Sequence, residues 1–505
     1  MIDSTAQSKP HRANDGPVRY TVRTFSPLFS AADRMSKPAD PPRPAIALPP
    51  RGAALLLAVG PAIVWCAEYI GSGEVILATR TGAVLGSGVL WAVFIGVFLK
   101  YLIGLAGGWY TVATGESMID LFGRLPGPKN AFVWVVFFVQ LVASIFAIGS
   151  IASSAGVFIA ELTPIPAYLA GWMVTLFAVT IAWIGEFRMM KFVMAALISL
   201  TLVGVVVIAV QVMPPLGELL AGLVPKVPAV PDWAVAQKAN PNGWSEVLPL
   251  LGWGAGGFAS QVWYTYWVMG AGYGAAAGNR QGKPADEALL KTLNSEDAQR
   301  IAGWRRLVTF DATSAMVVGI AVTSGFLLAG AGVLGANEVA PEGTKVAFTL
   351  ASLFGSQWGS TGATLFLVGG AAALVSTQLA QVAGWPYLLD DCVRLCLPKT
   401  VAAWSPITRR RAWLVFYLIA SMAIVYRLGY NPVALVQFAA TLEGLVLTPL
   451  QALAMIVGLY WILPKLYQPE VGAQLRPGPF IGVGLVVCFL FFTAAVVMSL
   501  VIAMK

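Results

Sequence analysis

Apolar stretches of 18 or more residues recur from residue 52 to the C-terminus, and they constrain the fold more than any other feature of the sequence. A helix of that length crosses the ~30 Å of hydrocarbon in a lipid bilayer. The composition agrees, since 58% of the 505 residues are hydrophobic and only 11% are charged, whereas a soluble domain carries about 25% charged residues. We therefore predict an all-α integral membrane protein that crosses the lipid bilayer many times.

The apolar stretches divide the chain into two parts. Residues 1–51 are polar, proline-rich and basic, with too little apolar material to offset the entropy of ordering, so they are predicted to be a disordered tail without a signal peptide. Residues 52–505 are predicted to form one transmembrane transporter domain. Its eleven predicted helices span approximately residues 53–84, 88–114, 130–160, 165–185, 189–213, 246–277, 303–333, 358–390, 411–428, 432–463 and 479–503.

Positive charge predicts the orientation. With the N-terminus in the cytoplasm, 25 of the 32 Lys and Arg residues fall on the cytoplasmic side and five fall outside, while Arg80 and Lys100 lie within spans. Cytoplasmic loops of membrane proteins carry such an excess. We therefore expect a multi-pass protein of an inner or plasma membrane. The basic residues are dispersed among the loops, so nucleic acid is not an expected partner.

Two long polar connections, residues 214–245 and 279–302, divide the helices into five, five and one. Transporters built from inverted repeats bind their substrate near mid-membrane, at discontinuous helices in corresponding positions of the two halves. The first and sixth helices are therefore the place where a binding site is expected.

Both of these helices contain a candidate interruption. Helix one has Gly71-Ser72-Gly73-Glu74 at its middle, and helix six has four glycines between Gly252 and Gly257, followed by Ser260 and Gln261. Close glycines weaken a helix and free backbone carbonyls. An ionised carboxylate at this depth costs several kcal/mol unless it is paired or hydrated. Glycine pairs also serve as packing notches in membrane helices, so the alternative is two tightly packed, unbroken helices.

At these residues the chain resembles the Nramp family of proton-coupled divalent metal transporters. The similarity covers most of residues 52–460 and depends on the order and spacing of short segments, namely Gly60-Pro61, Ala67–Glu74, Thr81-Gly82-Ala83, Phe310–Ala315 and Ser376–Ala380. The resemblance implies a LeuT-type fold, in which helices one to five and six to ten form 5+5 inverted repeats, here with an eleventh helix. It also implies secondary-active transport.

The departures from the family pattern indicate a divergent, Nramp-related branch. Typical members carry Asp-Pro-Gly-Asn at the helix-one break, where the Asp and Asn coordinate metal, and Met-Pro-His in helix six, which supplies a soft thioether and a histidine. This chain has Gly71 to Glu74 at the first position, and Ser260 and Gln261 lie near the position of the Met. The acidic residues of helix three correspond to positions near Ala147 and Ser150.

The residues at the two breaks supply carboxylate, amide, hydroxyl and backbone carbonyl oxygens. They predict a site for a hard cation, because oxygen ligands favour Mg²⁺, Ca²⁺ and Mn²⁺ whereas thioethers favour soft metals. A second carboxylate, that of Glu443 in helix ten, lies within one residue of the position of a helix-ten glutamine that approaches the metal in typical members. The predicted metal- or substrate-binding residues are Glu74, Gly71, Ser72, Ser260, Gln261 and Glu443.

Four further charged residues are candidates for proton transfer or for ion pairs, namely Glu68, Arg80, Lys100 and Asp311. If Lys100 or Arg80 neutralises Glu74, the site retains little negative charge for a divalent ion. Asp311 is as well placed to cap a helix as to take part in transport. Desolvation would also let a carboxylate such as Glu74 or Glu443 carry a proton.

The leading hypothesis is secondary-active transport of a divalent metal ion, with Mg²⁺ or Mn²⁺ favoured. The alternative is an amino-acid or organic-solute symporter on the same fold. An enzyme is not expected, because the only histidine is His11 in the tail and no HExxH or G-x-S-x-G motif occurs. No cofactor and no obligate protein partner are expected. The four cysteines lie in or beside apolar segments and are interpreted as small buried hydrophobic residues.

Overall fold

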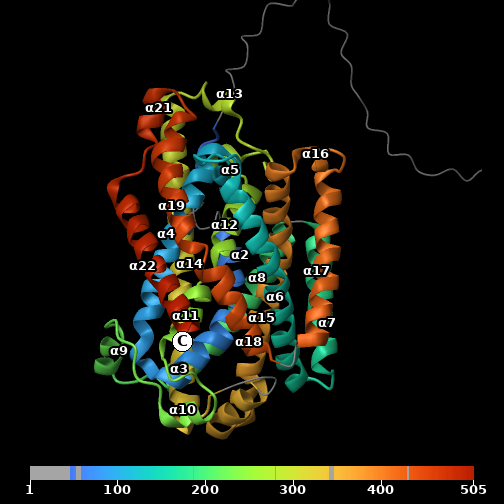
Figure 1. Ribbon diagram of the computed structural model, residues 1–505, viewed down its shortest axis with the longest axis vertical. Helices are drawn as coiled ribbons and strands as arrows, with labels where there is room; N and C mark the ends of the chain where they lie inside the picture. Colours follow the sequence, from blue (N-terminus) through green and yellow to red (C-terminus); the bar gives the residue numbers. More distant parts are fainter. Residues whose placement is uncertain are drawn as a thin grey trace, which may run out of the picture. The chain divides into compact units, whose positions relative to one another are not determined.

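Helices form the regular structure in the part of the chain that the computed structural model describes (Figure 1). That part comprises residues 46–52, 59–185, 187–278, 280–340, 346–428 and 431–504. Most of the predicted disordered tail and the predicted first turns of helix one, residues 53–58, lie outside it. Residues 45–505 belong to one structural unit, and its described residues contain no strand, as the sequence predicts.

Eight transmembrane helices in the described part are each built around one α-helix. They are α4 (Leu90–Thr114), α6 (Ala131–Leu162), α7 (Ala167–Ile184), α8 (Phe187–Gln211), α14 (Ser295–Ala329), α15 (Val346–Cys396), α17 (Pro406–Leu428) and α22 (Pro479–Ala503). Three more are composite. Helix one consists of α2 (Pro61–Tyr69), η1 (Gly73–Ala78) and α3 (Thr79–Leu85); helix six of α11 (Trp244–Trp253) and α12 (Phe258–Gly270); helix ten of α18 (Pro432–Ala439), η7 (Ala440–Leu445), α19 (Thr448–Val457), η8 (Gly458–Ile462) and α20 (Leu463–Lys465).

By length and composition, nine stretches of the described residues are long and apolar enough to cross a membrane. The sequence predicts eleven helices, and the difference has two causes. The turn η2 (Gly86–Val89) joins the second half of helix one to α4, so that residues 73–114 count as one stretch. The two halves of helix six, of 10 and 13 residues, are each too short to count.

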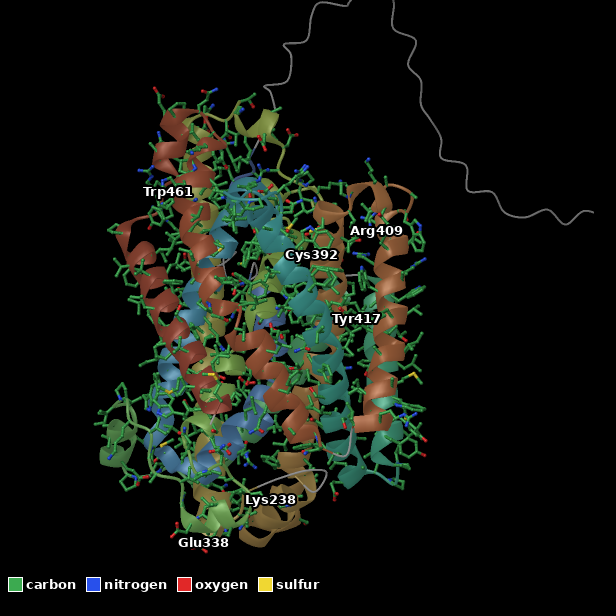
Figure 2. All side chains as sticks on the ribbon, viewed as in Figure 1. Lys238, Glu338, Cys392, Arg409, Tyr417 and Trp461 are labelled. Atoms are coloured by element: carbon green, nitrogen blue, oxygen red, sulfur yellow. The ribbon has the colours of Figure 1, made fainter. Side chains whose placement is uncertain are left out.

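Short helices lie at the two ends of the bundle. α5 (Met118–Gly123), α13 (Glu287–Leu290), α16 (Pro398–Val401) and α21 (Pro469–Gln474) lie at one end, hereafter the α5 end (Figure 1). α9 (Leu216–Gly222) and α10 (Asp232–Ala236) lie at the other, hereafter the α10 end. In Figure 2, Arg409 lies toward the α5 end, and Lys238 and Glu338 lie at the α10 end.

Two helices begin earlier than the sequence analysis predicts. Helix seven begins at Ser295 rather than at residue 303, because Asn294 caps it. The Asn294 side chain accepts hydrogen bonds from the amides of Glu296 and Asp297, and the Asp297 carboxylate accepts one from the Asn294 amide, which completes a capping box. Helix eight begins at Val346 rather than at residue 358, although its backbone is not helical at Trp358 and Gly359.

The two predicted breaks are present, and they face each other. Helix one is interrupted between Tyr69 and Gly73 and helix six between Trp253 and Phe258. A Cβ on Gly73 would lie 2.7 Å from the carbonyl oxygen of Trp253, so only glycine lets the breaks approach this closely. In helix six Ala255 has φ of +60°, a left-handed conformation that is uncommon for a residue with a side chain.

Candidate functional site

A small cavity lies between the two breaks. Oxygen atoms of helices one, six, eight and ten line it, and they belong to Glu68, Ser72, Ser260, Thr377, Gln381 and Glu443. Rings of Tyr69, Trp253, Trp263 and Trp385 complete its walls. The volume open to the centre of a water molecule is about 10 Å³, which is close to the space that one water molecule requires. The cavity therefore has the size and the polarity for one small ion or water.

Glu68 is the carboxylate that helix one presents to this cavity. It lies in the last turn of α2 and is 2% exposed. The Ser260 hydroxyl donates a hydrogen bond to the Glu68 carboxylate, and the Trp65 indole N–H donates to the Ser260 oxygen at 3.0 Å. The structure shows no ion pair between Glu68 and a basic residue in the described part of the chain.

Glu443 supplies a second carboxylate from helix ten. It lies in η7 and is 3% exposed. Its oxygens accept hydrogen bonds from the Trp253 indole N–H at 2.6 Å and from the Ala259 amide at 2.5 Å, at the first turn of α12. A helix N-terminus favours negative charge, so the first turn of α12 stabilises a carboxylate at this edge of the cavity.

Two polar residues of helix eight were not predicted as ligands. The Thr377 hydroxyl donates to the carbonyl oxygens of Glu68 at 2.5 Å and of Ile70 at 3.3 Å. The buried Gln381 Oε1 has no hydrogen-bond partner in the structure. These residues are four apart on one helix and therefore lie on one face. Two polar residues with this spacing in an apolar helix are a sequence signal that would have identified them.

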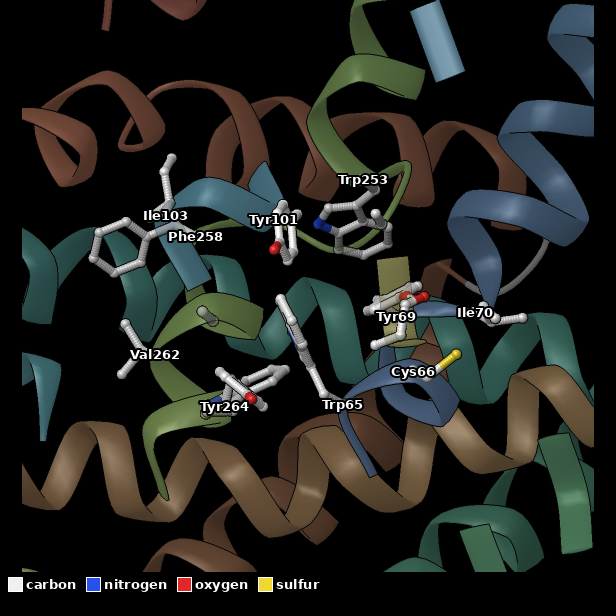
Figure 3. Packing of buried hydrophobic residues seen from close by; sticks show 14 of the residues in the cluster. Trp65, Cys66, Tyr69, Ile70, Tyr101, Ile103, Trp253, Phe258, Val262 and Tyr264 are labelled. Atoms are coloured by element: carbon white, nitrogen blue, oxygen red, sulfur yellow. Dashed lines mark hydrogen bonds between the residues drawn. The ribbon is translucent and has the colours of Figure 1, made fainter. Parts of the chain in front are cut away.

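Aromatic rings pack beside the cavity. Trp65 lies between Tyr69 and Tyr264, with ring centroids 5.7 Å and 4.4 Å apart (Figure 3). Their hydrogen-bonding groups point to fixed partners, since the Tyr264 hydroxyl donates to Asp311 at 3.0 Å and the Tyr69 hydroxyl donates to the carbonyl of Ala315. This packing fixes α2 against α12 and α14, and thereby the position of Glu68.

Glu74 braces the two breaks and is not among the residues that line the cavity. Its carboxylate accepts hydrogen bonds from the Gly71 amide at 2.8 Å, from the Ala255 amide at 3.2 Å and from the Thr323 hydroxyl at 3.2 Å. It thus satisfies one free N–H in each break. Gly71 is used in the same contact, and Gln261 is buried with its Nε2 atom unpartnered, outside the lining of the cavity.

Because Glu74 serves both breaks, we expect Glu74→Gln to destabilise the protein by about 1–3 kcal/mol, the cost of leaving a buried donor unsatisfied. The amide of the new glutamine can accept from one break but presents N–H groups to the other. Thermal unfolding in detergent measures this loss. Thr323→Val is the milder control, since it removes one donor and leaves both breaks satisfied. An unchanged unfolding midpoint for Glu74→Gln would contradict the bracing role.

Three other charged residues do not form the expected pairs with Glu74. Arg80 pairs with Glu246 of α11, with Nη2 3.0 Å from Oε1 and both side chains buried. Lys100 donates to backbone carbonyls of helix six. Asp311 accepts from the amides of Gly60 at 3.2 Å and Ala62 at 2.9 Å, so it caps the first half of helix one. Arg80 and Lys100 have their partners in helix six, and Asp311 has its partners at the start of helix one. Nearness to Glu74 along the chain therefore gave no guide to these partners.

A charged network lies at the α5 end of the bundle. Arg394 pairs with Asp120 at 2.6 Å and with Asp391 at 2.9 Å. Asp391 also accepts hydrogen bonds from the Ser117 hydroxyl at 2.8 Å and from the Tyr266 hydroxyl at 2.7 Å, which fastens the end of α12 to helix eight. Burial, together with the neighbouring Asp391 carboxylate, raises the pKa of Asp120 above its usual value. This network ties α5, α12 and α15 together.

Comparison with known proteins gives a match to one family over part of the chain, and a fold. The model of the family described as natural resistance-associated macrophage protein-like, or Nramp, matches residues 62–236. An uncharacterized protein of Pasteurella multocida (strain Pm70), PM0681, is 23% identical over 203 residues, which are 39% of this chain and 43% of that protein. The aligned region thus spans less than half of that relative.

The solved structures that resemble this chain share its fold at low sequence identity. A mutant of the manganese transporter of Eremococcus coleocola superposes with a TM-score of 0.67 at 15% identity, covering 89% of this chain and 88% of that chain. MhsT in complex with L-phenylalanine has a TM-score of 0.54 at 13% identity, covering 88% and 98% of the two chains. The predicted LeuT-type fold is thereby confirmed.

Proposed function

We propose that this chain is a divergent, Nramp-related transporter and that it moves a divalent metal cation across the membrane, with hard cations such as Mg²⁺ or Mn²⁺ favoured. The observation that carries the proposal is the pair of carboxylates, Glu68 and Glu443, that line one small cavity between two broken helices. Manganese is named for the transporter of Eremococcus coleocola, and its fold supports the same class of cargo here.

The ligand chemistry supports a hard cation. The cavity offers carboxylate, hydroxyl and amide oxygens and no sulfur or imidazole ligand among the described residues that line it. Mg²⁺ binds with one or two carboxylates and retains several waters. The proposed ligands are therefore Glu68, Glu443, Ser72, Ser260 and Gln381, while Glu74 and Gly71 support the breaks.

The cavity does not suit an amino acid. An amino acid presents a carboxylate, which would meet two carboxylates in this cavity and no lining basic residue. The likeness to MhsT therefore supports the shared fold and not a shared cargo.

We propose that the α5 end faces the cytoplasm. That end carries Arg124, Arg394 and Arg409, in keeping with the excess of positive charge in cytoplasmic loops. The network of Arg394 with Asp120 and Asp391 then forms an inner gate. Metal would leave the cavity toward the cytoplasm when this network opens.

Proton coupling is part of the proposal. Two carboxylates in a buried cavity require a positive charge, and a metal ion or protons can supply it. When the metal leaves, protons on Glu68 or Glu443 would replace it. An inward proton gradient is therefore expected to increase metal uptake.

Uptake into proteoliposomes tests this function. We expect Mg²⁺ or Mn²⁺ to enter vesicles that contain the protein and to exceed entry into protein-free vesicles, with Zn²⁺ and Cd²⁺ entering less because the site lacks soft ligands. Repeating the assay with and without an inward proton gradient measures the coupling. If a folded protein moves no divalent ion, the metal proposal is wrong, and labelled amino acids become the next substrates to test.

A further inference from the structure

The buried ammonium of Lys100 lies in a ring of backbone carbonyls at the helix-six break. Lys100 projects from the middle of α4 and is 1% exposed. Its Nζ atom lies 2.8 Å from the carbonyl oxygen of Gly252, 2.9 Å from that of Gly254 and 2.7 Å from that of Gly256. The first oxygen belongs to the last turn of α11, and the others belong to the break itself.

These three contacts match the donors of a protonated side chain. A protonated lysine has three N–H donors, whereas a neutral amine has two. The three acceptors at 2.7–2.9 Å therefore use every donor of the charged ammonium. No carboxylate among the described residues forms an ion pair with Lys100. Its charge is met by the carbonyl dipoles at the C-terminal end of a half-helix, which carry partial negative charge, and by the ring of Phe492 at 6.0 Å.

Oxygens that converge in this way form a cation site. In transporters with broken helices, unwound carbonyls and the C-terminal ends of half-helices coordinate the coupling cation. Here the space at the centre of the three oxygens already holds a positive charge that is attached to the chain. We propose that Lys100 is a tethered cation that occupies a monovalent-cation site at the helix-six break, so that no free Na⁺ or K⁺ is needed there.

The site is separate from the metal cavity. Lys100 does not line that cavity, although Gly256 contributes to both. The inference therefore does not require that the cargo be a metal, and a test of stability in the absence of cargo can decide it independently of any transport result.

Lys100→Ala opens the site in a defined way. The substitution removes three carbons and the nitrogen, and n-propylammonium contains the same atoms. We therefore expect the variant to unfold several degrees below the parent in choline chloride, and to regain much of that loss in chloride salts of K⁺, NH₄⁺ or n-propylammonium at equal ionic strength. The parent should unfold at the same temperature in all of these salts.

Two further variants separate a cation site from an ordinary capping contact. Lys100→Met fills the same space without charge, so it should be destabilised and should not respond to cations. Lys191→Ala removes a lysine that donates to a single carbonyl, that of Val59 at 3.0 Å, and it should show no cation-specific recovery. The measurement is the thermal unfolding midpoint of each purified variant in each salt.

Three outcomes would overturn the proposal. The first is a parent protein that Na⁺ or K⁺ stabilises specifically over choline, because its site would then be unfilled. The second is a folded Lys100→Ala variant that no cation stabilises more than choline does. The third is a Lys100→Met variant as stable as the parent. If Lys100→Ala cannot be purified in any salt, the parent and Lys100→Met series still decide the question.

Discussion

Replacing Glu68 by Gln is expected to reduce divalent-cation uptake about 100-fold or more while the protein remains folded. Removing one partner from a buried charge pair costs about 3–5 kcal/mol, and each 1.4 kcal/mol corresponds to a tenfold change in affinity. The new amide keeps the size of the side chain and can still accept the hydrogen bond from Ser260. The loss should therefore come from the missing charge and not from collapse of the cavity.

A companion substitution shows whether the two carboxylates act together. Glu443→Gln should also reduce uptake, but it should lower stability as well, since the Ala259 amide and the Trp253 indole both donate to this carboxylate. The Glu68 carboxylate accepts a hydrogen bond from the Ser260 hydroxyl, which a glutamine oxygen can also accept, so Glu68→Gln should leave the unfolding midpoint nearly unchanged. Metal-induced stabilisation of the parent, absent in both variants, provides a second readout that does not depend on transport.

An exposed residue supplies the matched control. Glu161→Gln makes the same chemical change at the solvent-exposed end of α6 and should leave uptake unaltered. Full metal uptake by Glu68→Gln, at equal amounts of folded protein, would remove Glu68 from the site. Full uptake by both variants of the cavity carboxylates would contradict the proposed site as a whole.

The two breaks that flank the candidate cavity could be predicted from the sequence, but the carboxylate of helix one that lines it could not. Clusters of glycine correctly indicated the two breaks, because glycine weakens helices wherever it occurs. The sequence favoured Glu74, which is next to the Gly71–Gly73 break. In the structure, the six residues that follow Ser72 form the π-helix η1, whose wider turn changes the direction of each side chain. Glu74 therefore points to backbone amides, and Glu68 in the regular helix α2 points to the cavity.

Lys100 shows a second limit of the sequence. A lysine within a span is costly, and it predicts a partner, for which a carboxylate is the usual choice. The actual partners are backbone carbonyls of Gly252, Gly254 and Gly256. Every residue has a backbone carbonyl, so the residue types in the sequence do not indicate which carbonyls accept from Lys100. Only the path of the unwound backbone shows them. Residues that meet other side chains, such as Gln378 with Thr175 at 3.0 Å, are easier to anticipate as interhelical hydrogen bonds.

Removing Arg80 is expected to cause the largest loss of stability among single substitutions at the breaks. Arg80 holds Glu246 through Nε and Nη2 contacts of 3.0–3.2 Å, and the two side chains are only 5% and 4% exposed. Arg80→Met would leave a buried carboxylate without its partner, which costs about 3–5 kcal/mol. Because Glu246 belongs to α11 and its carbonyl accepts from Thr81, the same change should loosen helix one from helix six at the α10 end.

A double substitution separates the cost of a stranded charge from the value of the ion pair. Arg80→Met with Glu246→Leu removes both charges, and it should recover much of the stability that Arg80→Met loses, since a buried ion pair replaced by apolar groups is often neutral. Arg300→Met tests a half-exposed pair, with Glu296 one turn away at 69% exposure, and should cost less than about 1 kcal/mol. Unfolding titrations of the four proteins measure these differences. If Arg80→Met lowers the free energy of unfolding no more than Arg300→Met does, the Arg80–Glu246 pair does not hold the two broken helices together. A small loss would mean that water already solvates the Glu246 carboxylate.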